Sequence, residues 1–154
     1  MSQLIYSVLA SLDCYIADED GSFDWAVSDE EVLDHITGQF RAVSTYLYGR
    51  RMYELMTVWE TDPAAAAQSP GSAKFASVWQ RARKVVFSTT LAAASTSNTT
   101  LERAFGPERV ARIKAEPEGD LTIDGSTIAA HAAVQLHAAK WASARRMASE
   151  RFTF

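Results

Sequence analysis

Short apolar runs rich in β-forming residues alternate with helical patterns along this chain, and this alternation constrains the fold more than any other feature. It is typical of a three-layer α/β/α domain, in which helices cover both faces of a largely parallel, mixed sheet. The runs that predict strands are Leu4–Ser11, Val43–Gly49, Lys84–Ser88, Leu121–Ile123 and, more weakly, 97–103. Helical spacing and start signals predict helices over about 29–41, 50–56, 73–83, 107–114 and from Thr127 onward.

Two segments lie outside this alternation. Residues 61–72 are rich in proline, alanine and glycine, and we expect a mobile loop there. From about His137 the chain is alanine-rich and basic, and we expect a helical tail with a thin apolar face. No domain-sized linker or repeat interrupts the sequence, so residues 1–154 are expected to form one domain. The charged residues of the tail are Lys140, Arg145, Arg146 and Arg151, against Glu150.

The composition argues against several broad classes. A formal net charge of −4 and a pI near 5.3 do not suit generic nucleic-acid binding, which needs a basic face. No apolar run approaches the ~20 residues of a membrane-spanning helix. No basic segment precedes the apolar start, as one would in a secretory signal. Cys14 is the only cysteine, which excludes an intramolecular disulfide and fits a reducing cytoplasm. We therefore expect a soluble, cytoplasmic protein.

Polar residues that suit a phosphorylated ligand follow three of the predicted strands. In parallel α/β sheets, ligands bind at the carboxyl ends of the strands, where helix N-termini offer free N–H groups. Arg50 and Arg51 offer forked, permanently charged donors after the second strand. Gly125, after the last strand, lets the backbone approach an anion closely. Hydroxyl donors come from Ser88, Thr89, Thr90, Ser126 and Thr127. A ligand with a pyrophosphate and a separate phosphate would suit this set, and NADPH has that shape.

Each of these segments also has a purely structural interpretation. Taken alone, "GRR" is more often a strand exit with solvated charges, "FSTT" an ordinary helix cap, and "DGST" as readily a turn with a cap. Asp13 is either a loop-capping residue or a group that hydrogen-bonds a substrate. The dinucleotide fingerprint with three glycines and the phosphate-loop lysine are both absent. The scattered histidines predict no metal site, and Cys14 without a nearby histidine does not indicate a nucleophile.

Five segments, in one order, resemble the dihydrofolate reductase-like superfamily: "SLDCYIADEDGSFDW", "YLYGRRMYELMTVW", "KVVFSTTL", "SNTTL" and "GDLTIDGSTIAAHA". Within it, the chain is most similar to the C-terminal reductase domain of the riboflavin-biosynthesis deaminase/reductase (RibD C-terminal domain), over about Leu4 to Ala133. The resemblance implies an α/β/α fold, NADPH as hydride donor and usually a homodimer. The chain departs from the family at Cys14, where glycine is usual, and beyond Ala133, where two further strands would follow.

The resemblance also implies roles for individual residues. Asp13 would be the acid nearest the reacting face, and Tyr15, Ile16 and Trp25 would border the nicotinamide and the substrate. Gly49, Arg50 and Arg51 would serve the 2′-phosphate end of the cofactor. Its adenosine and ribose would lie along Ser88 and Thr89, and its pyrophosphate on Gly125, Ser126 and Thr127.

The sequence thus predicts an NADPH-dependent reductase that transfers a hydride to a small heterocyclic or carbonyl substrate, pyrimidine- or pterin-like. Two alternatives remain open. In the first, the chain is a non-catalytic nucleotide-binding or dimerisation module that has lost its substrate pocket. In the second, it is a plain α/β interaction domain whose strand-end polar residues only cap helices.

Overall fold

The structure, a computed structural model, describes residues 3–22, 30–116 and 119–134. Its sheet has five strands in the order β1-β5-β2-β3-β4. All four pairings are parallel, so the sheet in the described part of the chain is wholly parallel rather than mixed. The strands are β1 Leu4–Ser7, β2 Val43–Gly49, β3 Arg83–Phe87, β4 Thr99–Glu102 and β5 Asp120–Asp124. Trp25 and the predicted tail from His137 lie outside the described residues.

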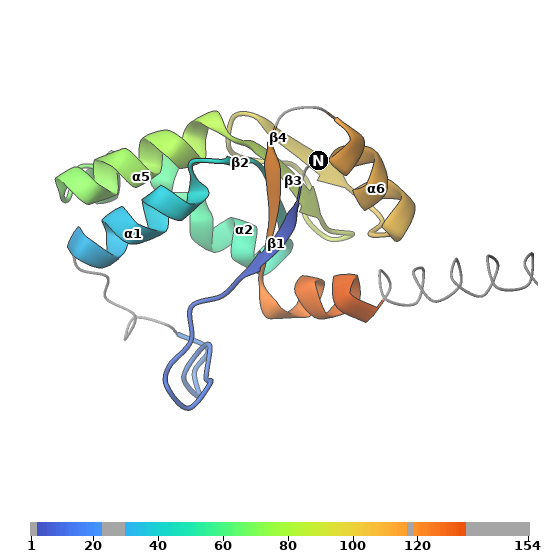
Figure 1. The fold of residues 1–154 in the computed structure, drawn as a ribbon, viewed down its shortest axis with the longest axis horizontal. Coiled ribbons are helices and arrows are strands. Elements are labelled where there is room, and N and C mark those ends of the chain that lie inside the picture. Colours follow the sequence, from blue (N-terminus) through green and yellow to red (C-terminus); the bar gives the residue numbers. More distant parts are fainter. Residues whose placement is uncertain (1–2, 23–29, 117–118, 135–154) are drawn as a thin grey trace, which may run out of the picture.

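Helices cover both faces of the sheet, which confirms the predicted three layers (Figure 1). One face packs on α1 Glu30–Phe40, α2 Arg50–Met56 and α5 Pro70–Arg81, and its core is built around Tyr46, Tyr48 and Trp79. The other face packs on α6 Pro107–Ala115 and on a helix over residues 126–134. Val110 and Ile113 of α6 are 0% and 2% exposed, so they point inward as predicted.

The central strand β2 and the helix after it occupy the residues that the sequence predicts. Residues 46–48 of β2 are at most 1% exposed, because the strand lies between two neighbours and under helices on both faces. A strand buried in this way is a continuous apolar run, which is easily read from the sequence. Gly49 ends the strand in an extended conformation and α2 begins at once with Arg50. The weaker strand predicted within 97–103 is confirmed as β4.

The prediction of a mobile loop over residues 61–72 is wrong. The segment holds the end of α3 Val58–Thr61, all of α4 Pro63–Ala66 and the start of α5. The Asp62 carboxylate accepts from the N–H groups of Ala64 (2.9 Å) and Ala65 (3.2 Å), and the Ser69 hydroxyl accepts from the N–H of Ser72 (3.1 Å). In both helices a proline occupies the first turn, where its missing N–H costs nothing. The prolines therefore start helices here rather than break them.

β1 is the other difference, since it ends at Ser7 rather than Ser11. Its pairing with β5 runs from Leu4–Leu121 to Ser7–Asp124, and β5 has no further residues to offer. The chain then leaves the sheet as a loop over residues 8–22, which hangs away from the body of the domain (Figure 1). β1 thus stands at one edge of the sheet, with β5 as its one partner among the described strands.

Candidate functional site

The carboxyl ends of β5, β2 and β3 lie side by side at one edge of the sheet. Gly49 is in register with Phe87, and Tyr48 with Asp124. The strands are parallel, so the residues that follow them emerge at the same edge. The structure therefore brings "GRR", "FSTT" and "DGST" together, as the topology argument predicts.

Arg50 connects two of these segments. Its Nη1 donates to the Thr90 Oγ1 at 3.0 Å, which ties the start of α2 to the loop after β3. Its Nε donates to Glu54 one turn further along α2, at 2.8 Å, and 47% of the side chain remains exposed. Arg51 is exposed, and no hydrogen bond or ion pair engages its guanidinium in the described part of the chain. Two permanent positive charges thus stand at this edge within reach of an anion.

Ser88 has a local structural role. Its hydroxyl accepts from the N–H groups of Thr90 (3.2 Å) and Leu91 (3.0 Å), so it shapes the turn after β3. Its own N–H donates to the Glu102 carbonyl at 2.9 Å, which continues the β3–β4 ladder. Thr89 is exposed beside it. The turn presents Thr89 and Thr90 to solvent, next to Arg50.

Gly125 is held close to α2. It has φ +101°, and an added Cβ would lie 3.4 Å from the Met52 Cβ and 3.8 Å from the Ile128 Cγ2. Ser126 and Thr127 begin the following helix and are exposed. The first N–H groups of any helix lack an intrahelical acceptor, so this start offers backbone donors as well as two hydroxyls. An added Cβ at Gly49 would also lie 3.8 Å from the Ile128 Cβ, so both glycines are neighbours of Ile128.

Asp124, which the sequence reasoning did not select, is the most perturbed acid at this edge. It is 7% exposed, and burial raises the pKa of its carboxyl to about 7, although a hydrogen bond from the Thr122 hydroxyl (3.0 Å) opposes the shift. It lies between Ser7 of β1 and Tyr48 of β2. The sequence signal was present: two polar residues, Thr122 and Asp124, alternate with apolar ones in a strand that is otherwise buried.

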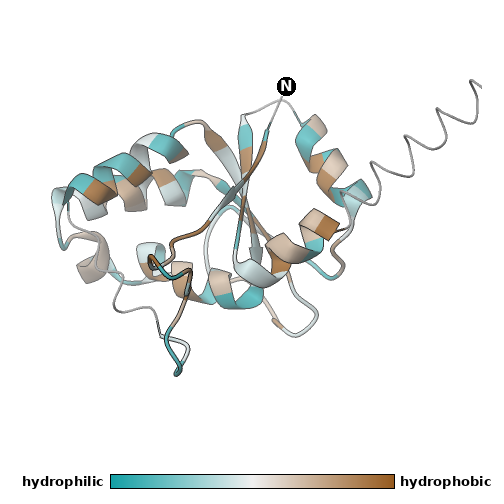
Figure 2. Cartoon of the chain, turned by 60° about the horizontal axis from the view of Figure 1, so that its bottom comes forward, coloured by the Kyte–Doolittle hydropathy of each residue, from teal (hydrophilic) through white to brown (hydrophobic). Residues whose placement is uncertain are grey.

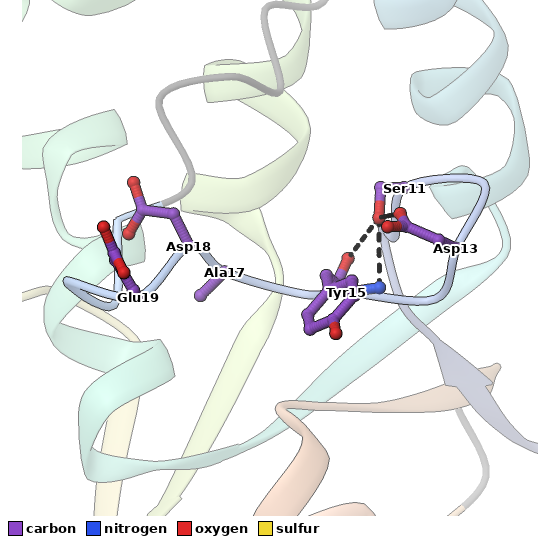
Figure 3. A pocket seen from close by; sticks show the side chains of 6 residues that line it. All are labelled: Ser11, Asp13, Tyr15, Ala17, Asp18 and Glu19. Carbon is purple, nitrogen blue, oxygen red and sulfur yellow. Dashed lines mark hydrogen bonds between the residues drawn. The ribbon is translucent and has the colours of Figure 1, made fainter.

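The predicted substrate residues lie on the loop over residues 8–22. The Ser11 hydroxyl donates to the Asp13 carboxylate at 2.5 Å and accepts from the Tyr15 N–H at 3.0 Å (Figure 3). Tyr15 and Ile16 are 65% and 44% exposed. An open concavity of about 550 Å³ lies along this loop, and its lining residues are Ser11, Asp13, Tyr15, Ala17, Asp18 and Glu19.

This concavity does not reach the phosphate-suited edge, since its lining holds no residue of "GRR", "FSTT" or "DGST". The structure therefore joins the predicted cofactor residues to one another but not to Asp13, Tyr15 and Ile16. Cys14 explains part of the loop's shape. It adopts φ +69°, a left-handed conformation that glycine takes freely and cysteine takes with strain.

In residues 3–22, 30–116 and 119–134, no group of three or more His, Cys, Asp or Glu side chains is arranged to hold a metal ion. None of the helices in those ranges has the length and apolar character needed to cross a membrane.

Comparison with known proteins places this geometry in context. The model of the RibD C-terminal domain family matches residues 2–141. A crystal structure from Shewanella sp. PV-4, of a protein whose name assigns it to riboflavin biosynthesis, is similar with a TM-score of 0.56 and 21% sequence identity. The similarity covers 81% of this chain and 65% of that one, so the chain spans about two thirds of the structure it matches. No curated protein matches.

Proposed function

The chain belongs to the RibD C-terminal domain family, a family associated with reductases, and we propose that it is an NADPH-dependent reductase of a small heterocyclic or carbonyl substrate. The observation that carries the proposal is the convergence of Arg50, the turn at Ser88 and the close-packed Gly125 at one edge of the sheet. Guanidinium groups, hydroxyl groups and the N-terminus of a helix together suit a ligand with several phosphate groups.

The residues at this edge fit the cofactor in their donor chemistry. Gly125 has φ +101°, a conformation that side chains rarely adopt, and a residue without a Cβ suits a backbone that a pyrophosphate approaches closely. Gly125, Ser126 and Thr127 would hold the pyrophosphate. Ser88 and Thr89 would lie along the adenosine and ribose, and Gly49, Arg50 and Arg51 would bind the 2′-phosphate. When bound, NADPH supplies the hydride, and the protein supplies orientation and a proton.

Two carboxyl groups are candidates for that proton. Asp13 is the acid that the family resemblance implies, with Tyr15, Ile16 and Trp25 bordering the substrate. Asp124 stands at the same end of the sheet, and its pKa of about 7 keeps a proton on much of the population at neutral pH. We expect Asp124→Asn to reduce kcat with little change in KM for NADPH. Asp13→Asn should reduce kcat only if the loop over residues 8–22 closes on the cofactor edge of the sheet. Steady-state kinetics of the two variants assign the donor. Unchanged kcat in both would contradict both assignments.

Arg50→Ala tests the cofactor assignment. We expect the NADPH affinity to fall by about 1.5–3 kcal/mol, the scale of a hydrogen bond to a charged group, and the NADH affinity to change little, because NADH has no 2′-phosphate. Titration with each cofactor, followed by nicotinamide fluorescence, measures both. Arg112→Ala, an exposed arginine on α6, is the matched control and should change neither. Absence of binding, or equal binding of the two cofactors by the wild type, would remove the basis for the proposal.

A second candidate function follows from the separation of the Asp13 loop from the cofactor edge. A nucleotide-binding or dimerisation module without a working substrate pocket would bind NADPH and lose affinity in Arg50→Ala, yet would not oxidise NADPH with any of a panel of pterins, pyrimidines and quinones. Homodimer formation is also part of the proposal, and light scattering of the full chain tests it.

A further inference from the structure

An uncovered apolar surface runs along β1 and the loop that follows it. Of the ten large hydrophobic side chains that are exposed in the described part of the chain, seven lie between residues 5 and 16. We call the following five the β1 surface: Ile5 (36% exposed), Tyr6 (52%), Val8 (49%), Leu9 (51%) and Leu12 (107%). Figure 2 shows brown, apolar stretches of this loop standing clear of the body of the domain.

The β1 surface is uncovered on both sides. Ile5 and Tyr6 are consecutive, so they point to opposite faces of the sheet, and both are exposed. The middle of β1 is therefore exposed on both faces, whereas Leu4 at its start is partly buried against the core cluster that includes Val110 and Ile113 of α6. The strand also stands at the sheet edge, with one side of its backbone unpaired among the described strands. Natural proteins cover such edges, and a contiguous exposed apolar patch marks a docking surface.

The charge of the candidate segments indicates which one docks on the β1 surface. Residues 1–40 contain no lysine or arginine, and the loop carries Asp13, Asp18, Glu19 and Asp20. A second copy of this same surface would bring like charges together. Residues 23–29 carry Asp24 and Asp29 and no basic residue, so they suit the surface no better. Residues 137–154, in contrast, hold four lysines and arginines against Glu150 alone.

We propose that the C-terminal segment 137–154 of the same chain docks on the β1 surface. Trp141, Met147 and Phe152 supply large apolar groups for Tyr6, Leu9 and Leu12. Arg145 and Arg146 lie between Trp141 and Phe152 in sequence and suit Asp18 and Glu19. Basic side chains at the rim of an apolar contact fix its orientation as well as adding attraction.

The chain can reach this surface. The helix over residues 126–134 begins directly after β5, the strand that pairs with β1. Its nine residues carry the chain roughly 13 Å away, at 1.5 Å per residue. The segment 137–154 spans about 27 Å if helical and up to about 60 Å if extended, which is ample for a return.

Cys14 provides the test, because it is the one cysteine of the chain and lies, exposed, inside the acidic loop. A nitroxide is attached to Cys14 of the full-length, ¹⁵N-labelled protein, and the amide signals of residues 137–154 are compared with the nitroxide oxidised and reduced. Docking predicts that these signals lose most of their intensity in the oxidised state. Unchanged signals would overturn the proposal.

Matched variants test the role of charge. Arg145→Glu with Arg146→Glu should restore the lost intensity, whereas Arg112→Glu on α6 should leave the loss as it was. Adding Asp18→Lys and Glu19→Lys to the first pair should bring the loss back. Two outcomes would contradict the proposed pairing: Arg112→Glu restoring the signal intensity, or the added lysines at 18 and 19 failing to bring the loss back.

A mixed sample decides whether the segment belongs to the same chain. Unlabelled protein that carries the nitroxide is mixed with ¹⁵N-labelled protein that lacks it. Same-chain docking predicts no loss of intensity in this mixture. A loss there would show that the segment lies on a second copy and would overturn the assignment to one chain. None of these signals requires cofactor or turnover, so the proposed function and this docking fail independently.

Discussion

Gly125 holds a left-handed backbone conformation against the side chain of Met52, and this makes it the most constrained residue at the candidate cofactor edge. We expect Gly125→Ala to lower the free energy of unfolding by about 1–2 kcal/mol, the cost of placing a Cβ at positive φ, and to weaken NADPH binding. Urea unfolding and cofactor titration measure the two effects. Gly38→Ala is the control, since Gly38 lies in α1 without a positive φ and has open space around it, so alanine there should not lower the free energy of unfolding. A comparable loss in Gly38→Ala would contradict the role given to the left-handed backbone of Gly125.

Asp124 links pH to the stability of the fold. An unfolded aspartate has a pKa near 3.9, and burial raises that of Asp124 to about 7, so between these values the native state binds more protons than the unfolded state. The free energy of unfolding must therefore fall as pH rises from about 4 to 7, by up to about 4 kcal/mol from this group. Asp124→Asn removes the titration. Urea unfolding at several pH values should show a smaller decline in the variant, and parallel profiles would contradict the assignment.

At the scale of elements, the Tyr53 side chain of α2 holds the loop between β3 and β4 in place through hydrogen bonds to its hydroxyl. The Tyr53 hydroxyl accepts from the N–H groups of Ser95 (2.8 Å) and Thr96 (3.1 Å). Tyr53→Phe leaves both donors without this acceptor, and we expect a loss of about 1–3 kcal/mol in the free energy of unfolding. Faster hydrogen exchange at residues 95 and 96 should accompany it. Tyr6→Phe, whose side chain is half exposed, should change neither measurement.

The central strand, which is buried on both faces, and the helix directly after it are the most predictable elements from the sequence. β2 and α2 match their predicted ranges, because a continuous apolar run that ends in Gly49 leaves little choice of boundary. The prediction fails at residues 61–72 because their proline and glycine indicate a loop, whereas Asp62 and Ser69 cap helices there. The meeting of Arg50, Ser88 and Gly125 followed from parallel topology alone. The burial of Asp124 could not be predicted from the sequence, because it depends on β5 inserting between β1 and β2. The pairing of β5 with β1 joins residues more than a hundred positions apart.

At the scale of the whole molecule, the fold has a well-packed part, which is the sheet with its helices, and an exposed part, which is the loop over residues 8–22. The sheet from β5 to β3 carries both core clusters, while the loop presents Leu12 and Tyr15 to solvent. No local pattern could predict where this loop lies, because its position depends on what contacts it rather than on its own residues. The proposed catalytic and docking roles of this loop both rest on such contacts.

The strand order has a consequence for synthesis. β1 leaves the ribosome first, yet the strand it pairs with is β5, the last of the five to be made. Until residue 124 has emerged, Ile5, Tyr6 and the apolar residues after them have no native neighbour in the sheet. Such late, long-range pairing slows folding and prolongs exposure to other nascent chains. Among the five strands, β1 is therefore the one whose apolar residues would need a chaperone for longest.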